Sequence, residues 1–181
     1  IRSFGLAFQS EYTWKQVSFG LDAGFASGDS APYFGYLDKS NFADPKFRNP
    51  QLSSFYFHPD YRVDTILFRH VIGTVTDAVY FKPFVQYDLF ENENDALAGR
   101  LDIVYARAIE TGATPGDAAD LGVETNLKIF YEEKGFFYAG IEWAMLWPLK
   151  GLNLIPTYED AGVSKTSRWS TAVRARIGVM F

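Results

Sequence analysis

The sequence predicts an all-β fold, an antiparallel transmembrane β-barrel, from three observations. Seven segments of the 181-residue chain alternate apolar residues with polar or small ones. These segments run to about 11–15 residues, longer than the usual soluble strand and long enough to cross a membrane. Aromatic residues make up 18% of the chain, although its mean hydropathy is only −0.10. They must therefore be arranged in a pattern rather than merely be abundant.

The composition excludes several classes of protein. The chain has no cysteine and two histidines, which excludes a disulfide scaffold, a thiolate zinc site and a cysteine nucleophile. Its net charge of −5, without a dense basic run, argues against nucleic acid as the main partner. No uncharged run approaches the ~20 residues that a membrane helix needs. A helical membrane protein is thus excluded.

The predicted strands each have one apolar and one polar face. In the strand 121–131, for example, Leu127 and Ile129 alternate with Glu124 and Lys128. Arg107 is the exception, because it falls in phase with the apolar residues of its strand. Two explanations stay open: the side chain extends to lipid head groups near a strand end, or a bulge turns it inward. The predicted strands are 4–14, 17–25, 79–89, 101–109, 121–131, 137–147 and 169–181.

The apolar face is expected to contact lipid and the polar face to line a lumen, the reverse of a soluble β-protein. The polar face mixes charges of both signs with Gly and Ala, as an aqueous interior would. A soluble β-sandwich or lipocalin-like barrel remains the alternative. Aromatic residues gather near the ends of the apolar faces, where the girdles of membrane barrels lie: Tyr12, Trp14, Tyr131, Trp147, Trp169 and Phe181.

The connections alternate between short and long, as periplasmic turns and extracellular loops do. Counting back from a periplasmic carboxyl terminus places 30–75 outside the cell, whereas 90–99 is long for a periplasmic turn. Single-chain bacterial barrels have even strand numbers. We therefore expect the single domain 1–181 to be the carboxyl-terminal seven strands of a larger barrel. The alternative is a complete eight-stranded barrel in which 61–71 is the eighth strand.

The long extracellular loop 30–75 is expected to fold toward the pore, because its apolar residues would not stay in water. Its second part predicts a short helix over 61–73 that ends at Gly73. Val63, Ile66, Leu67 and Val71 share one stripe of that helix. One interpretation makes the loop a constriction with charged residues facing the pore, and the other a lid held by packing with solvated charges. The candidate constriction residues are Arg62, Asp64, Arg69 and His70.

Two segments resemble known outer-membrane proteins. Residues 173–181, which end on Phe181, resemble the terminal β-signal of Gram-negative outer-membrane proteins, which implies delivery to the barrel assembly machinery. Residues 55–78 resemble a segment of an uncharacterised, considerably longer, myxobacterial-type outer-membrane protein family. A weaker likeness is to porin-like polysaccharide exporters, which also carry long loops that fold into the pore. None of these resemblances implies an enzymatic activity.

Nothing in the sequence predicts an enzyme, a cofactor or a metal site. Only His58 and His70 could serve as a base, no nucleophile elbow is present, and the loop acids lack EF-hand spacing. We expect a porin-like outer-membrane channel for small polar solutes or ions, or for a polymer, with outer-membrane lipid and lipopolysaccharide as further partners. A structural or interaction barrel with a plugged lumen is the alternative. The expected pore-lining residues are Lys82, Asp88, Glu124, Lys128, Glu132, Glu142, Arg168, Arg174 and Arg176.

Overall fold

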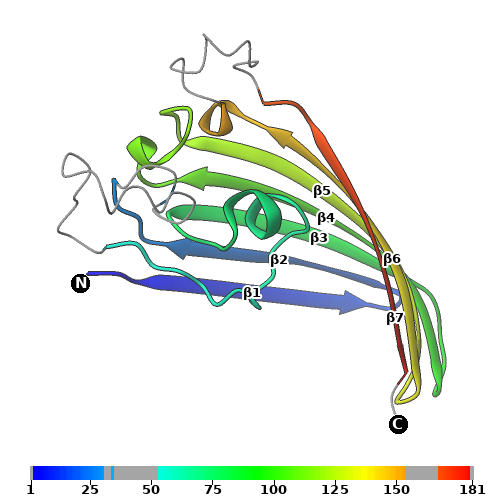
Figure 1. Cartoon of the computed structure of the whole chain (residues 1–181). Coiled ribbons are helices and arrows are strands. Elements are labelled where there is room, and N and C mark those ends of the chain that lie inside the picture. The colour runs from blue at the N-terminus through cyan, green and yellow to red at the C-terminus, as the bar shows by residue number, and fades with distance from the viewer. Residues whose placement is uncertain (1, 31–33, 35–52, 154–166, 180–181) are drawn as a thin grey trace.

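In the part of the chain that the structure describes, seven strands form one antiparallel sheet, each strand pairing with the next along the chain (Figure 1). The structure is a computed structural model and describes residues 2–30, 34, 53–153 and 167–179. The predicted all-β class and number of strands are thus confirmed. The strands are β1 (Gly5–Trp14), β2 (Val17–Ala26), β3 (Ala78–Glu91), β4 (Asp95–Ala108), β5 (Asp120–Glu133), β6 (Phe137–Pro148) and β7 (Ser170–Val179).

The sheet is open, because β1 and β7 form its two edges and do not pair with each other. The eight-stranded alternative is wrong: residues 61–71 form no strand and lie on one face of the sheet. Their only regular element is a π-helix, η4 (Leu67–Ile72). Two short 3₁₀ turns, η5 (Thr111–Ala113) and η6 (Lys150–Leu152), lie in the other long connections.

Short and long connections occupy opposite ends of the sheet, as the alternation predicts. The connection between β3 and β4 is shorter than expected, because β4 begins at Asp95 and not at 101. The side-chain oxygen of Asn92 accepts the backbone N–H groups of Asn94 and Asp95 at 2.9 and 2.7 Å, which closes a tight turn. All three connections at this end are therefore short.

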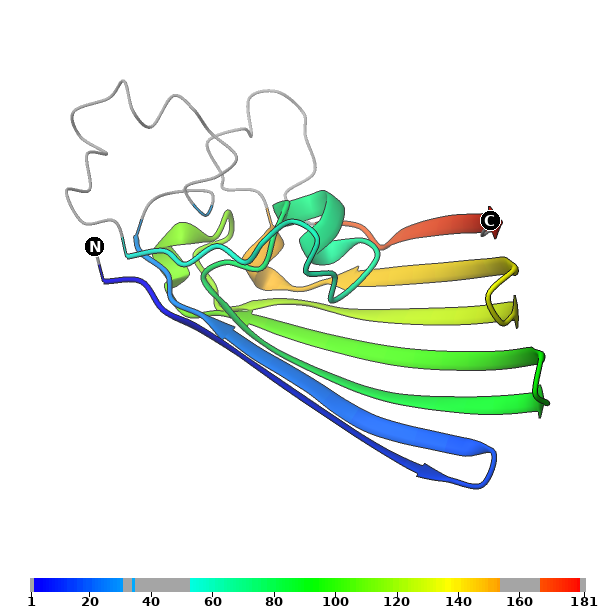
Figure 2. The same cartoon turned by 90° about the horizontal axis from the view of Figure 1, so that it is seen from below.

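The sheet curls, and the segment 53–77 lies on the side toward which it curls (Figure 2). We call 53–77 the docked segment, the face that it covers the inward face, and the opposite face the outward face. On the inward face, one cross-strand row consists entirely of polar residues. This polar row contains Thr13, Ser18, Gln86, Arg100, Lys128, Glu142 and Arg174, each opposite the next.

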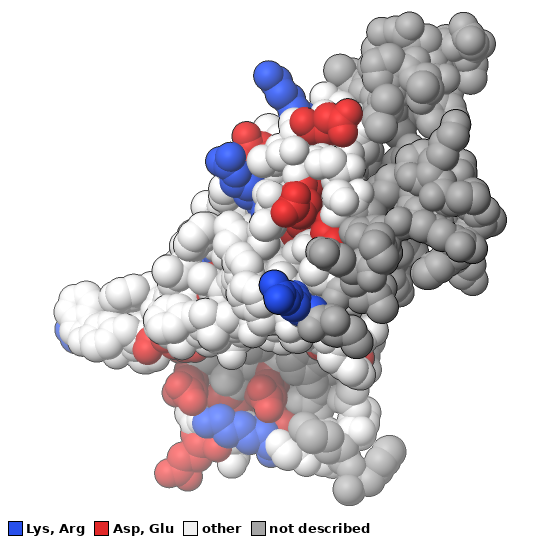
Figure 3. All heavy atoms as spheres, turned by 90° about the vertical axis from the view of Figure 1, so that its left-hand side faces the viewer, with Lys and Arg blue, Asp and Glu red and all other residues white. Residues whose placement is uncertain are grey.

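The neighbouring row on the outward face is entirely apolar. Its members are between 38% and 67% exposed, so the alternation in the sequence separates the two faces as predicted. Charged side chains in Figure 3, which looks onto the end with the long connections, form separate groups with broad uncharged surface between them. The apolar row contains Tyr12, Phe19, Val85, Leu101, Leu127, Trp143 and Val173, each opposite the next.

A β-bulge near the start of β5 corrects one prediction. Leu121 is expected on the outward face, but it has no exposure and belongs to the core. Arg107 pairs with Asp120 and Ala106 with Gly122, so Leu121 is the extra residue and turns inward. Arg107 itself stays exposed, with Nη1 3.9 Å from Asp120 Oδ1. Inward rotation of Arg107 is therefore wrong.

The docked segment is held mainly by apolar packing. Its buried residues, among them Leu67, Phe68 and Ile72, meet inward-facing side chains of β3 to β6 such as Tyr80 and Leu146. Gly73 ends the helix as predicted, with φ of +104° and its N–H donating to Phe68 O. Val71 is exposed and Phe68 buried instead, because the π-helical pitch shifts the apolar stripe. No helix in the described parts of the chain is long and apolar enough to cross a membrane.

Candidate functional site

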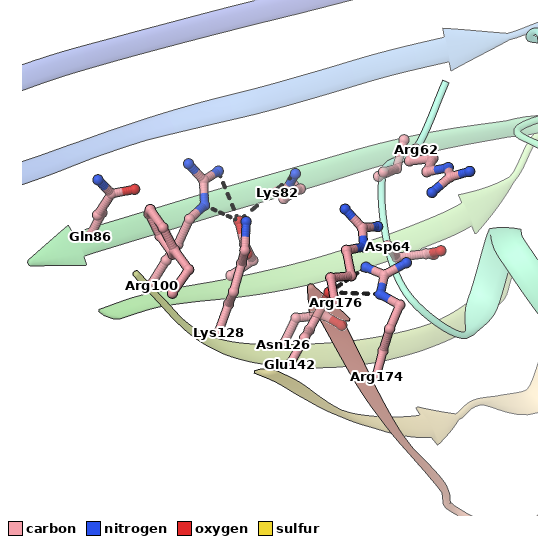
Figure 4. A pocket seen from close by; sticks show the side chains of 13 residues that line it. Arg62, Asp64, Lys82, Gln86, Arg100, Asn126, Lys128, Glu142, Arg174 and Arg176 are labelled. Carbon is pink, nitrogen blue, oxygen red and sulfur yellow. Dashed lines mark hydrogen bonds and ion pairs between the residues drawn. The ribbon is translucent and has the colours of Figure 1, made fainter. Parts of the chain in front are cut away.

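A charged cavity of about 310 Å³ lies between the docked segment and the inward face (Figure 4). Five successive strands, β3 to β7, form its wall, and the docked segment contributes three residues beside it. The polar row crosses this wall. The lining residues are Arg62, Val63, Asp64, Lys82, Gln86, Arg100, Asp102, Asn126, Lys128, Phe130, Glu142, Arg174 and Arg176.

An ion-pair network occupies the β2–β4 side of the cavity. Lys82 Nζ lies 3.1 Å from Asp22 Oδ2 and 3.8 Å from Asp102 Oδ1. Arg100 Nε donates to the same Asp102 oxygen at 3.0 Å, and Arg100 Nη2 forms an ion pair with it at 3.0 Å. The Arg100 guanidinium also lies 3.7 Å from the centre of the Phe84 ring. These cations are paired and fixed in place.

Lys128 lies at the centre of the polar row without a carboxylate partner among the described residues. Its cross-strand neighbours are Arg100 on one side and Glu142 on the other. Glu142, however, accepts hydrogen bonds from Arg174 and from the Thr65 hydroxyl. The Lys128 ammonium instead lies 4.6 Å from the centre of the Phe130 ring.

Glu124 fastens the docked segment to the sheet. Its carboxylate has no exposure and accepts the backbone N–H groups of Thr65, Ile66 and Leu67 at 2.8–3.2 Å. A carboxylate saturated in this way is well satisfied although it is buried. The prediction that Glu124 lines a pore is therefore corrected, because the docked segment covers it.

Asp64 lines the cavity, but its carboxyl oxygens are bonded within its own segment. It accepts the N–H groups of Phe68 at 2.8 Å and Arg69 at 3.2 Å, which begins the π-helix. Burial raises the pKa of Asp64 well above the usual range of a carboxyl, and the nearby Glu124 carboxylate raises it further. The carboxyl groups of Asp64 and Glu124 thus lie close together where the docked segment meets the sheet.

The other predicted site residues divide into three groups. Lys82, Lys128, Glu142, Arg174 and Arg176 line the cavity, together with Arg62 and Asp64 from the docked segment. Arg69 is half-buried beside a second cavity of about 240 Å³ that Arg62 and Asp64 also line.

The remaining predicted residues lie elsewhere. Asp88 and Glu132 are near the short turns, where Asp88 accepts a hydrogen bond from Gln86 at 2.9 Å, and neither lines the cavity. Arg168 precedes β7 and borders a separate, mainly apolar cavity. His70 is exposed and lines neither of the two cavities beside the docked segment, so its place at a pore stays a prediction. Phe181 and most of the first part of the long loop lie outside the described residues.

Sequence reasoning missed Arg100 because it began the strand at 101, and extending the alternation backward by one residue would have placed Arg100 on the inward face. It missed Asp102 although this residue lies between Leu101 and Ile103, on the polar phase of the predicted strand. It also missed Gln86 and Asn126, uncharged members of the same face whose importance depends on cross-strand register. That register is not encoded by local alternation.

No group of three or more His, Asp or Glu residues in the described parts of the chain is arranged to hold a metal ion. Comparison with protein families, with curated proteins and with solved structures finds no match. The resemblances to outer-membrane proteins therefore stay predictions.

Proposed function

We propose that the chain forms part of a porin-like outer-membrane β-barrel that passes small polar solutes or ions. The observation that carries the proposal is the pair of adjacent rows across all seven strands. One is wholly apolar and exposed, and the other is wholly polar and borders a cavity. In membrane barrels, apolar side chains face lipid and polar ones face the lumen.

A bilayer explains the exposed outward face better than water does. Contiguous apolar surface larger than a few hundred square ångströms is rare on soluble monomers, yet here it extends across the whole sheet. All four tryptophans are at least 40% exposed, which suits contact with lipid and its interface. The strands are 10–14 residues long, sufficient for a tilted membrane crossing.

The open edges indicate how the barrel would be completed. Unpaired backbone groups on β1 and β7 would be costly in the hydrocarbon core, where every N–H and C=O needs a partner. We therefore propose that further strands join these edges and that this chain supplies seven strands of a larger barrel. An even total follows the rule for single-chain barrels.

The docked segment would act as the constriction of this channel. Its apolar residues pack on the half of the inward face nearer the long connections, around Tyr80 and Leu146. The charged cavity lies beside it, toward the short turns. Solutes passing through the lumen would therefore meet the cations of the polar row next to the narrowest part.

The experiment is conductance of the full-length protein in planar bilayers. Discrete ion-conducting steps are expected, and they should enlarge when the docked segment is loosened. Quenching of tryptophan fluorescence by brominated lipids should occur in the same preparation, since all four rings are exposed. Extraction without detergent, together with absence of quenching, would contradict the membrane assignment.

A structural barrel with a closed lumen is the second candidate, favoured by the complete satisfaction of the buried Glu124 carboxylate. These hydrogen bonds hold the docked segment against the sheet. Lipid quenching without conducting steps would favour this candidate over a channel.

A further inference from the structure

The charged cavity is basic, although the chain as a whole is acidic. Its lining contains six cationic side chains against three carboxyl groups, whereas the net charge of the chain is −5. One of the three carboxyls, Asp64, is occupied by two backbone N–H groups. The cations are Arg62, Lys82, Arg100, Lys128, Arg174 and Arg176.

Three of these cations have no ion pair within the described residues: Arg62, Lys128 and Arg176. Lys82, Arg100 and Arg174 by contrast each pair with a carboxylate. The unpaired set comes from three elements, namely the docked segment, β5 and β7, which surround the same space (Figure 4). All three side chains border the cavity, and no carboxylate of the described residues forms an ion pair with them.

Lys128 lies between a like charge and an opposite charge in the polar row. Arg100 is directly opposite on β4, and like charges in this arrangement destabilise a sheet. Glu142 is directly opposite on β6 and attracts Lys128, but its carboxylate is bonded to Arg174 and Thr65. A negatively charged ligand in the cavity would give Lys128 a partner that it does not share with Arg174.

We propose that this cavity is an anion-binding site, which makes the channel selective for small oxyanions with a phosphate or carboxylate group. The inference rests on the proposed channel function and names its substrate class. Arginine guanidinium groups bind both oxyanions in a bidentate manner, and a lysine adds a point charge. The volume of about 310 Å³ is at the lower end of small-ligand sites, which span about 300–1,000 Å³.

The test measures reversal potentials of the full-length protein in planar bilayers under a KCl gradient. Wild type should be more permeable to chloride than to potassium. Lys128→Glu should lower the chloride-to-potassium permeability ratio by about threefold or more, since a unit charge inside a narrow aqueous pore is weakly screened. Lys15→Glu makes the same charge change on an exposed turn outside the cavity and should leave the ratio unchanged.

Block of the chloride current by inorganic phosphate supplies a second measurement, which can be made on the wild-type protein. Phosphate should reduce the chloride conductance of wild type in a saturable way, and Lys128→Gln should weaken this block. Conducting channels with no anion preference and no phosphate block would overturn the inference while leaving the channel function intact.

If no conductance is observed in bilayers, calorimetry with inorganic phosphate in detergent micelles tests the anion site separately from the channel function. Phosphate binding that Lys128→Gln abolishes would support the site although the channel function had failed. Absence of binding to the folded wild-type protein would overturn the site as well.

Discussion

The Glu124 carboxylate accepts the backbone N–H of Leu67 at 2.8 Å, across 57 positions of the sequence. The neighbouring Thr65 and Ile66 donate to the same carboxylate. One side chain of β5 thus holds the start of the π-helix against the sheet. This contact links the folding of the docked segment to the width of the proposed pore.

Replacing Glu124 should loosen the docked segment. Glu124→Ala leaves three buried N–H groups without their acceptor, and each unsatisfied group costs about 1–3 kcal/mol. We expect a loss of about 3 kcal/mol or more in the free energy of unfolding, together with larger conductance steps. Glu124→Gln keeps one acceptor oxygen and should lose less. Urea unfolding in lipid vesicles measures the first effect and planar bilayers the second.

Glu132→Ala is the matched control for this prediction. It removes a carboxylate from the same strand, but from outside the cavity and the docking contacts. An equal loss of stability in both alanine variants would show that the Glu124 contacts contribute nothing particular.

The free energy of unfolding should fall as pH rises, because burial keeps some carboxyl groups protonated in the folded state. Burial raises the pKa of Asp77 to about 7, and the pKa of Asp64 is raised in the same direction by burial and by Glu124. An unfolded carboxyl titrates near 4. The stabilisation is therefore complete below about pH 4 and lost as pH rises through the folded pKa values, by at most about 1.4 kcal/mol per pH unit for each proton.

Asp64→Asn isolates one of these groups, since the amide oxygen can still accept an N–H of the π-helix. The variant should show a shallower fall in the free energy of unfolding between about pH 5 and about pH 8, because burial and the Glu124 carboxylate raise the folded pKa of Asp64 above the unfolded value near 4. Asp60→Asn, at an exposed position of the docked segment, serves as the comparison. A slope in Asp64→Asn as steep as in wild type would contradict the assignment.

A charge on the outward face should be costly in proportion to its depth. Leu127→Arg lies in the middle of β5 within the apolar row and should destabilise the protein in bilayers by about 2–4 kcal/mol. Leu89→Arg lies near the short-turn end of β3 and should cost only about 0–1 kcal/mol. Unfolding in vesicles compares the two, and equal small losses would argue against lipid contact at Leu127.

Gly20 should not tolerate a side chain. A Cβ at this position would collide with the Ser10 carbonyl and the Phe84 ring, on which Arg100 rests. Gly20→Ala is expected to destabilise the sheet by about 1–3 kcal/mol. Gly99→Ala meets nothing within 4 Å and should be close to neutral by the same unfolding measurement.

Alternation alone predicted most of the sheet. Residues such as Trp143 and Ile177, expected on the lipid-facing side, are exposed, and Lys128 and Arg174 face the cavity. The reason is physical: side chains in a strand alternate between faces, so a polar phase and an apolar phase in the sequence become two faces in space. Gly73 ends the helix because its positive φ has little cost without a Cβ.

Features that depend on distant parts of the chain were not predictable in this way. The burial of Glu124 needs the docked segment, which comes from about 58 positions earlier in the sequence. The inward turn of Leu121 depends on a bulge against β4, and the unpaired state of Lys128 on which neighbour takes Glu142. Each is decided by cross-strand register, which a local pattern leaves open.

The adjacency of the polar and apolar rows also favours the correct strand register when the protein folds. A shift of one position in the pairing of any two strands would exchange their faces, sending an arginine or lysine outward and a leucine or tryptophan into water. Every mispaired intermediate would carry that penalty at several places at once. The contrast between the two rows therefore disfavours a wrong register during folding, before the strand pairing is complete.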